Sequence, residues 1–164
     1  MCAFLYLTLL IFRQLESTIA KFMGTSEAIC YADSVSCVAS AVPAFSKRGD
    51  LLIIDDAANH ALRTGALLSR SKCLYYKHND MEDLERVLRG AVQRFRSSAK
   101  TQRRFIVFEG LFKQDGSIPK LDKIAELAAR YEWSVWMCRA VVAPADACAV
   151  ETHRVVTRPG SNSA

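Results

Sequence analysis

Two short apolar runs restrict the fold of this chain more than any other feature of its sequence. Residues 51–54 read LLII, residues 105–108 read FIVF, and each run is followed directly by an acidic residue. Such runs, too short for helices and bounded by turn residues, are typical of strands that are covered on both faces. Both are therefore predicted to lie in the interior of a mostly parallel sheet.

Strand patterns and helical patterns alternate along the rest of the chain. The helix expected at 34–45 should end near Pro43, because proline disfavours the helical conformation in the residue before it. The clearest helix begins after Asn79, which we expect to cap it together with Glu82 in a capping box. Further strands are expected at 28–32, 72–78 and 133–137, and further helices at 12–24, 57–70 and 121–131. This alternation predicts an α/β fold, a mostly parallel sheet with helices on both faces.

Composition is that of an ordinary globular domain and excludes several classes of function. The chain has 164 residues, 51% of them hydrophobic, and a net charge of +5. Apart from Phe95, no aromatic residues alternate with the basic residues near it, so a nucleic-acid partner is not expected. The six cysteines form no C-x-x-C pair and match no zinc spacing, so we expect no metal site and reduced thiols facing the cytosol.

Both ends of the chain depart from the alternating pattern. Residues 1–11 form an apolar segment of uncertain status: a buried strand, a partial anchor or an artefact of where the chain is taken to begin. With about 12 apolar residues where about 20 span a bilayer, and no basic stretch before them, neither a membrane helix nor a secretory signal is expected. Residues 138–164 lack a sustained period and end in Gly, Ser and Asn, so we expect a disordered tail.

The acidic ends of the two apolar runs carry the candidate site. Ligands of open α/β sheets bind beyond the carboxyl ends of the strands, where this chain has DDAANH and EGLFKQDG. Two interpretations of the first segment stay open. Either Asp55 or Asp56 caps the following helix, or His60 faces a ligand crevice. In the second case we expect His60, Glu109 and Lys113 to point into the same crevice.

Five stretches of the sequence together are similar to a known family. In chain order they are Y-x-x-S-x-x-C-V-A-S-A-V-P-A-F-S-K-R-G-D from Tyr31, D-x-x-N-H-A-L from Asp56, SRS, KHNDMEDLERVL and RRFIVFEGLFKQDGSIPKL. They resemble the α-oxoamine synthases, pyridoxal-phosphate enzymes with the aspartate-aminotransferase type of fold. Through SAVPAFSKRGD, KHNDMEDLE and RRFIVFEGLF, the resemblance is closest to the family branch of first long-chain-base subunits of serine palmitoyltransferase. It covers residues 12–137, which implies a truncated large domain of that fold.

The resemblance implies three candidate contacts to pyridoxal phosphate. The histidine of D-x-x-N-H-A stacks on the cofactor ring in catalytic members, which gives His60 a role, unless it persists with no cofactor beside it. Ser34 stands where relatives have a glycine beside the cofactor phosphate, and could donate to that phosphate or cap the following helix. Glu109 is the third candidate. Lys113 replaces the serine that catalytic members carry after E-G-x-F, and is not the family's Schiff-base lysine.

The resemblance also implies that no catalytic residue lies in this segment. Catalytic members next carry D-E-x-H, whose aspartate pairs with the pyridinium nitrogen, but this chain reads WMCRAV there. The family's lysine would follow after Ala164. We therefore expect the chain alone to be inactive and not to bind the cofactor covalently.

The function implied by the resemblance is that of a serine C-palmitoyltransferase subunit. The complete protein would pair with a second, catalytic long-chain-base subunit, and the heterodimer would condense serine with palmitoyl-CoA in sphingolipid long-chain-base synthesis. It would lie on the cytosolic face of the endoplasmic reticulum membrane, held there only through the complete protein, whereas this chain expressed alone would be cytoplasmic.

Two alternatives stay open. The first is a truncated catalytic α-oxoamine synthase of the aminooxobutyrate ligase or aminooxononanoate synthase type, which His60 favours and Lys113 opposes. The second is a non-enzymatic interaction module that regulates a full-length subunit.

Overall fold

The computed structural model describes residues 2–24, 26–95, 102–140 and 148–151. The chain divides into two compact units, Met1–Ala32 and Asp33–Ala164.

The first unit consists of helix α1, Cys2–Met23, and the segment that follows it. The helix includes the apolar start of the chain, so a buried strand there is wrong. No proline or glycine interrupts the helix before Gly24, which ends it with a φ of 68°. The strand expected at 28–32 is also wrong: the Cys30 amide donates to Glu16 Oε1 at 3.0 Å instead of to a neighbouring strand. Among the described helices, none combines the length and the apolar character needed to cross a bilayer.

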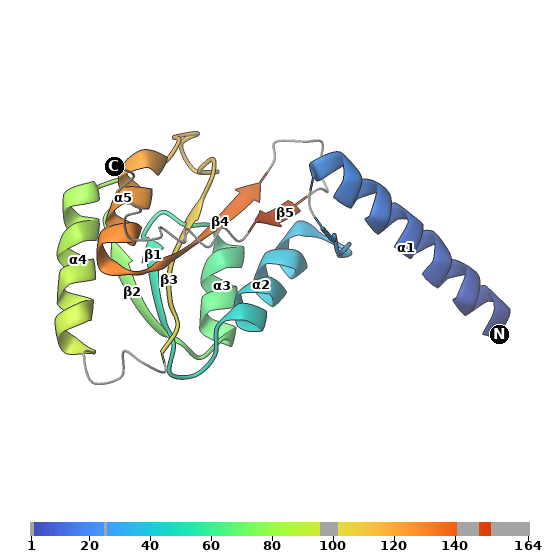
Figure 1. Cartoon of the computed structure of the whole chain (residues 1–164), viewed down its shortest axis with the longest axis horizontal. Coiled ribbons are helices and arrows are strands. Elements are labelled where there is room, and N and C mark those ends of the chain that lie inside the picture. Colours follow the sequence, from blue (N-terminus) through green and yellow to red (C-terminus); the bar gives the residue numbers. More distant parts are fainter. Residues whose placement is uncertain (1, 25, 96–101, 141–147, 152–164) are drawn as a thin grey trace, which may run out of the picture. The chain divides into compact units, whose positions relative to one another are not determined.

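The second unit is built on a five-stranded sheet (Figure 1). The strands are β1 Leu51–Asp55, β2 Lys72–Tyr76, β3 Arg104–Glu109, β4 Ser134–Ala140 and β5 Cys148–Glu151, in the order β2-β1-β3-β4-β5. The first four are mutually parallel and β5 runs antiparallel to β4. Both β1 and β3 have a strand on each side, so the prediction that these two apolar runs lie in the interior of the sheet is confirmed.

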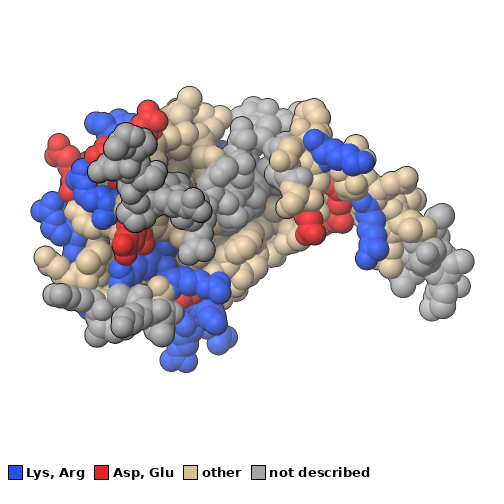
Figure 2. All heavy atoms as spheres, in the orientation of Figure 1, with Lys and Arg blue, Asp and Glu red and all other residues tan. Residues whose placement is uncertain are grey.

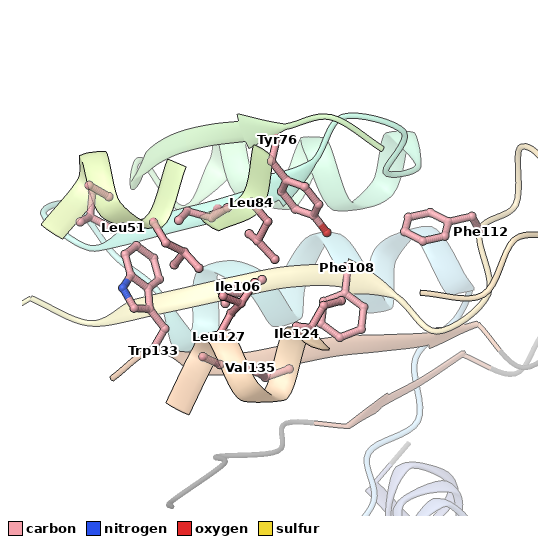
Figure 3. Packing of buried hydrophobic residues seen from close by; sticks show 14 residues of the cluster. Leu51, Tyr76, Leu84, Ile106, Phe108, Phe112, Ile124, Leu127, Trp133 and Val135 are labelled. Atoms are coloured by element: carbon pink, nitrogen blue, oxygen red, sulfur yellow. The ribbon is translucent and has the colours of Figure 1, made fainter. Parts of the chain in front are cut away.

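Helices cover both faces of this sheet, which confirms the predicted α/β fold. They are α2 Ser34–Phe45, α3 His60–Leu68, α4 Met81–Arg94 and α5 Leu121–Tyr131. Successive side chains of a strand point to opposite faces. Leu52 and Ile54 therefore pack with α2 and α3, whereas Leu51 and Ile53 pack with α4 and α5. Figure 3 shows the second of these cores, in which Phe108 and Ile106 of β3 meet Ile124 and Leu127 of α5.

Two details of the helix ends differ from the sequence-based expectations. Pro43 lies inside α2, which ends two residues later, close to the predicted position. The cap of α4 is Asp80 rather than Asn79, because the Asp80 carboxylate accepts hydrogen bonds from the amides of Glu82 and Asp83. Asn79 instead adopts a left-handed conformation with a φ of 51°. The proposed capping box is therefore wrong by one residue.

The expected disordered tail is partly ordered. Residues 138–140 belong to β4, and Cys148–Glu151 form β5 by pairing with β4, in the register Met137↔Glu151. For these residues the expectation of disorder is wrong, because β4 offers an edge to which the later segment can hydrogen-bond. The rest of the tail, including His153, lies outside the described residues.

Exposed basic side chains gather at the amino ends of the parallel strands. Lys47 and Arg48 lie in the turn before β1, Arg70 precedes β2, and Arg103 precedes β3. Figure 2 shows Lys and Arg grouped along the lower edge of the second unit. The buried Asp50 joins these turns: its carboxylate accepts hydrogen bonds from the amides of Lys47 and Arg103, and its backbone carbonyl accepts one from the Lys72 amide. This edge of the sheet is therefore basic and is tied together by backbone hydrogen bonds, while the candidate site lies at the opposite edge.

Substituting Gly65 tests the close packing of α2 on α3. A methyl group at Gly65 would lie 3.0 Å from Val42 Cβ and 3.1 Å from the Val38 carbonyl oxygen, so we expect Gly65→Ala to destabilise the fold by about 1–3 kcal/mol. Gly90 of α4 has no atom within 4 Å of the same position, so Gly90→Ala should stabilise by about 0.5–1 kcal/mol through helix propensity. Urea denaturation of both variants measures the two effects, and a gain in stability for Gly65→Ala would contradict the packing argument.

Candidate functional site

Asp55 ends β1 as a fully buried carboxylate at the edge predicted to bind ligands. Its Oδ1 accepts a hydrogen bond from the Ala57 amide at 2.9 Å, and its Oδ2 accepts one from the Asn79 amide at 3.1 Å. The cap of α3 is Asn59, whose Oδ1 accepts from the Leu62 amide at 3.0 Å. The interpretation in which Asp55 or Asp56 caps this helix is therefore wrong. Asp55 shapes the turns that follow β1 and β2.

Glu109 ends β3 and is also fully buried. Its Oε1 accepts a hydrogen bond from the Asn59 amide at 2.5 Å, and its Oε2 accepts one from the Lys113 amide at 3.3 Å. One carboxylate thus joins the loop before α3 to the loop after β3. Within the described structure, the Glu109 carboxylate accepts hydrogen bonds from backbone amides of the chain itself. Its role there is structural.

His60 is the first residue of α3, which begins three residues later than the helix expected at 57–70, and its side chain is exposed. Its Nδ1 lies 3.4 Å from Thr64 Oγ1, one turn along the helix. Lys113 is exposed on the loop after β3. Glu109 brings the backbone positions beside His60 and Lys113 together, because it binds the amides of Asn59 and Lys113. That all three side chains point into one crevice stays a prediction.

Ser34 is the exposed first residue of α2, but it is not the helix cap, so that reading of it is wrong. The cap is Asp33, whose Oδ1 accepts from the Ser36 amide at 2.8 Å and whose Oδ2 accepts from the Ser36 hydroxyl at 2.6 Å. The hydrogen bonds from the Ser36 side chain and backbone lower the pKa of Asp33. A negative charge therefore sits at the amino end of α2. The pattern Asp-x-x-Ser before an apolar helix could have identified this cap from sequence.

His78 is a site residue that the sequence did not reveal. It follows β2, and its Nδ1 lies 2.9 Å from Asp55 Oδ1. On the other side of the ring, Nε2 lies 3.0 Å from Ser117 Oγ and 3.2 Å from Asp115 Oδ2. These partners are 23, 39 and 37 residues away in the chain, so no local pattern could have indicated them.

Replacing Glu109 with glutamine tests whether this residue fastens the two loops. A glutamine keeps one carbonyl oxygen and puts an amide group opposite the other backbone donor, which leaves a buried N–H unpaired. We expect Glu109→Gln to lower the free energy of unfolding by about 1–3 kcal/mol. The control is Glu126→Gln, since Glu126 is 66% exposed in an ion pair with Arg130 and should contribute little. Chemical denaturation compares the variants, and equal stabilities would contradict this role.

Solved structures of similar fold include a serine palmitoyltransferase from S. paucimobilis with bound PLP-myriocin aldimine. It has a TM-score of 0.65 and 21% identity, and the match covers 74% of this chain and 30% of that one. An 8-amino-7-oxononanoate synthase from Francisella tularensis matches with a TM-score of 0.58 and 26% identity, over 71% of this chain and 31% of that one. At 21% identity, the first of these matches shows the fold alone. It confirms the aspartate-aminotransferase type of architecture and raises the question of whether the residues described above fit pyridoxal phosphate.

The residues present fit that cofactor only in part. The exposed ring of His60 is available for stacking on a pyridine ring. The amino end of α2, where a phosphate would bind through backbone amides and the helix dipole, instead carries the carboxylate of Asp33. Glu109 is fully buried and accepts hydrogen bonds from two amides of the chain. Taken together, these residues do not form a complete binding site for the cofactor.

Sequence comparisons give the family. The sequence model of Aminotransferase class I and II matches residues 3–137. Serine palmitoyltransferase 1 of Dictyostelium discoideum is 39% identical over 132 residues, which are 80% of this chain and 27% of that protein. Long chain base biosynthesis protein 1 of Arabidopsis thaliana is 38% identical over 120 residues, 73% of this chain and 25% of that protein. The chain thus spans about a quarter of these relatives. The family match and the PLP-bound neighbour imply pyridoxal phosphate as the family's cofactor. The chain belongs to the aminotransferase class I and II family.

Proposed function

We propose that this chain is part of a first long-chain-base subunit of serine palmitoyltransferase, of the kind that supports a second subunit holding the cofactor. The observation that carries the proposal is the identity of 38–39% to relatives named serine palmitoyltransferase 1 and long chain base biosynthesis protein 1. The complete protein would then serve the condensation of serine with palmitoyl-CoA as a heterodimer. We propose the cytosolic face of the endoplasmic reticulum membrane as its location, on the same ground.

The residues of the candidate site favour the role of a supporting subunit over that of a catalytic subunit. The carboxylate of Asp33 repels an anionic group at the amino end of α2, where the dipole would otherwise attract it. Lys113 stands on an exposed loop in place of the hydroxyl that catalytic α-oxoamine synthases carry. Glu109 is committed to two backbone amides. What is kept of the family site is its framework.

One observation favours the catalytic alternative. His60 has the position at the start of α3 and the solvent exposure that a ring-stacking histidine needs. A truncated catalytic α-oxoamine synthase is therefore the second candidate. The two candidates differ in whether the complete protein attaches the cofactor.

We expect the purified chain to form no stoichiometric covalent adduct with pyridoxal phosphate. An exposed ammonium group is a poor nucleophile near neutral pH, and Lys113 is an exposed lysine. The measurement is an absorbance titration with the cofactor, followed by borohydride reduction and peptide mapping. Lys113→Arg is the matched control and should leave the labelling pattern unchanged. A stoichiometric adduct on one lysine that competes with serine would refute the supporting role and favour the catalytic one.

The adjoining coding sequence offers a second test. A supporting subunit should lack both D-E-x-H and the cofactor lysine in the region that follows. Finding both motifs there would reverse the assignment in favour of the catalytic candidate.

A further inference from the structure

His78 connects three segments that follow neighbouring strands. Its Nδ1 meets Asp55 at the end of β1, while its own backbone lies between β2 and α4. Its Nε2 meets Asp115 and Ser117, which belong to the loop 110–118 after β3. The edge of the imidazole ring also packs against Phe112 of that loop, with 4.4 Å between ring centroids and an interplanar angle of 87°.

The loop 110–118 is held at both ends. At its start, Glu109 accepts a hydrogen bond from the Lys113 amide. Within the loop, the Phe112 amide donates to the Ser117 carbonyl at 3.0 Å, and the Gly116 amide donates to the Phe112 carbonyl at 2.9 Å, so the loop is closed on itself. At the far end the loop is joined to the segment after β2 by His78 and by the Asn79 side chain, which donates to the Ile118 carbonyl at 3.3 Å. A change at His78 is therefore expected to loosen one attachment of the loop that carries Lys113.

The hydrogen-bond pattern around His78 depends on its protonation. An imidazolium ring donates from both nitrogens, to Asp55 on one side and to Asp115 on the other. A neutral ring that donates from Nδ1 to Asp55 leaves a lone pair on Nε2. That lone pair can accept from the Ser117 hydroxyl but repels the Asp115 carboxylate. Only the protonated ring satisfies both acidic residues.

The charged groups around His78 favour the protonated ring. Burial alone would lower the pKa of His78, but hydrogen bonds and charge interactions with Asp55 and then Asp115 outweigh it, so the pKa is raised above 6.5. From β2, the buried phenol of Tyr76 also faces Asp55, and its pKa is raised by burial and by that carboxylate. Asp83 of α4 binds the Lys77 amide instead. The His78 side chain is 26% exposed, so it exchanges protons with solvent.

We infer that His78 is a positioning residue that, when protonated, fastens the loop 110–118 to the ends of β1 and β2, and that loses this hold when neutral. The inference does not rest on the proposed function, because each contact that carries it lies within the chain. It adds a pH-dependent element to the framework around Lys113 and Glu109. Asp115 is the loop residue that raises the pKa of His78, after Asp55 of β1. The loop's share of the stabilisation is therefore complete below the ordinary pKa and disappears as the pH rises through the raised value.

The test uses the full chain and needs no enzymatic activity. Histidine ring signals are followed by NMR against pH, and amide hydrogen exchange of peptides from 110–118 is measured at pH 6 and pH 9, after correction for intrinsic exchange. We expect His78 to titrate above the ordinary histidine value of about 6.5, because Asp55 and Asp115 face its two ring nitrogens. Loop protection should fall at pH 9, by about tenfold for each unit by which closure raises the pKa. A His78 that titrates at or below that ordinary value, or loop protection equal at both pH values, overturns the inference.

Variants separate positioning from a merely structural role. His78→Gln should give fast loop exchange at both pH values, whereas His60→Gln should leave the pH dependence intact. Asp115→Asn removes the loop's negative charge, at an exposed position, and should reduce the pH dependence of loop exchange. Ser117→Ala keeps that negative charge and should preserve the pH dependence. If His78→Gln fails to fold, the Asp115 and Ser117 variants still decide the matter. Equal pH dependence of loop exchange in these two variants would refute the proposed role of His78.

Discussion

Asp55 and Glu109 each place a carboxylate in the interior at the carboxyl end of a central strand, out of contact with water. A buried charge without partners costs several kcal/mol, and here backbone amides supply the compensation. Asp55 accepts from the amides of Ala57 and Asn79, and Glu109 accepts from those of Asn59 and Lys113. The four amides belong to the loops after β1, β2 and β3. Two side chains therefore bind backbone amides in each of the loops that follow these three strands.

This use of the acidic residues bears on what the site can do. Ligands of α/β sheets bind where these loops meet, yet the acceptors that a ligand would use there are occupied by the chain's own amides. The groups that face solvent include His60, Lys113 and the charged cap Asp33. An imidazole, an ammonium group and a carboxylate at the helix end do not form the phosphate cradle of a pyridoxal-phosphate site. Such an arrangement suits a subunit that keeps the family's framework and leaves the covalent chemistry to a partner, as we propose.

Sequence reasoning worked where the energetics are local or depend on burial alone. LLII and FIVF have no polar residue that could face water, so both had to be covered on two faces, and β1 and β3 are indeed interior strands. The helix after β1 was also expected, although it begins at His60 rather than at residue 57, because Asn59 and not Asp55 or Asp56 offers the side-chain acceptor to its first turn. The resemblance extended this reasoning to the family, which the match over residues 3–137 confirms.

Local reasoning failed where a distant partner decides between neighbouring residues. Asn79 and Asp80 are both good caps, but the Asn79 amide is taken by Asp55, 24 residues earlier. That bond goes with the left-handed backbone at Asn79 and leaves Asp80 to cap α4. The site role of His78 was missed for the same reason, because each of its hydrogen-bond partners lies more than 20 residues away in the sequence. In each case a buried carboxylate at a strand end selects its donor from the next loop in space. Which residue donates to the carboxylate is therefore decided by the parallel order of the strands, because that order places the loop beside the carboxylate.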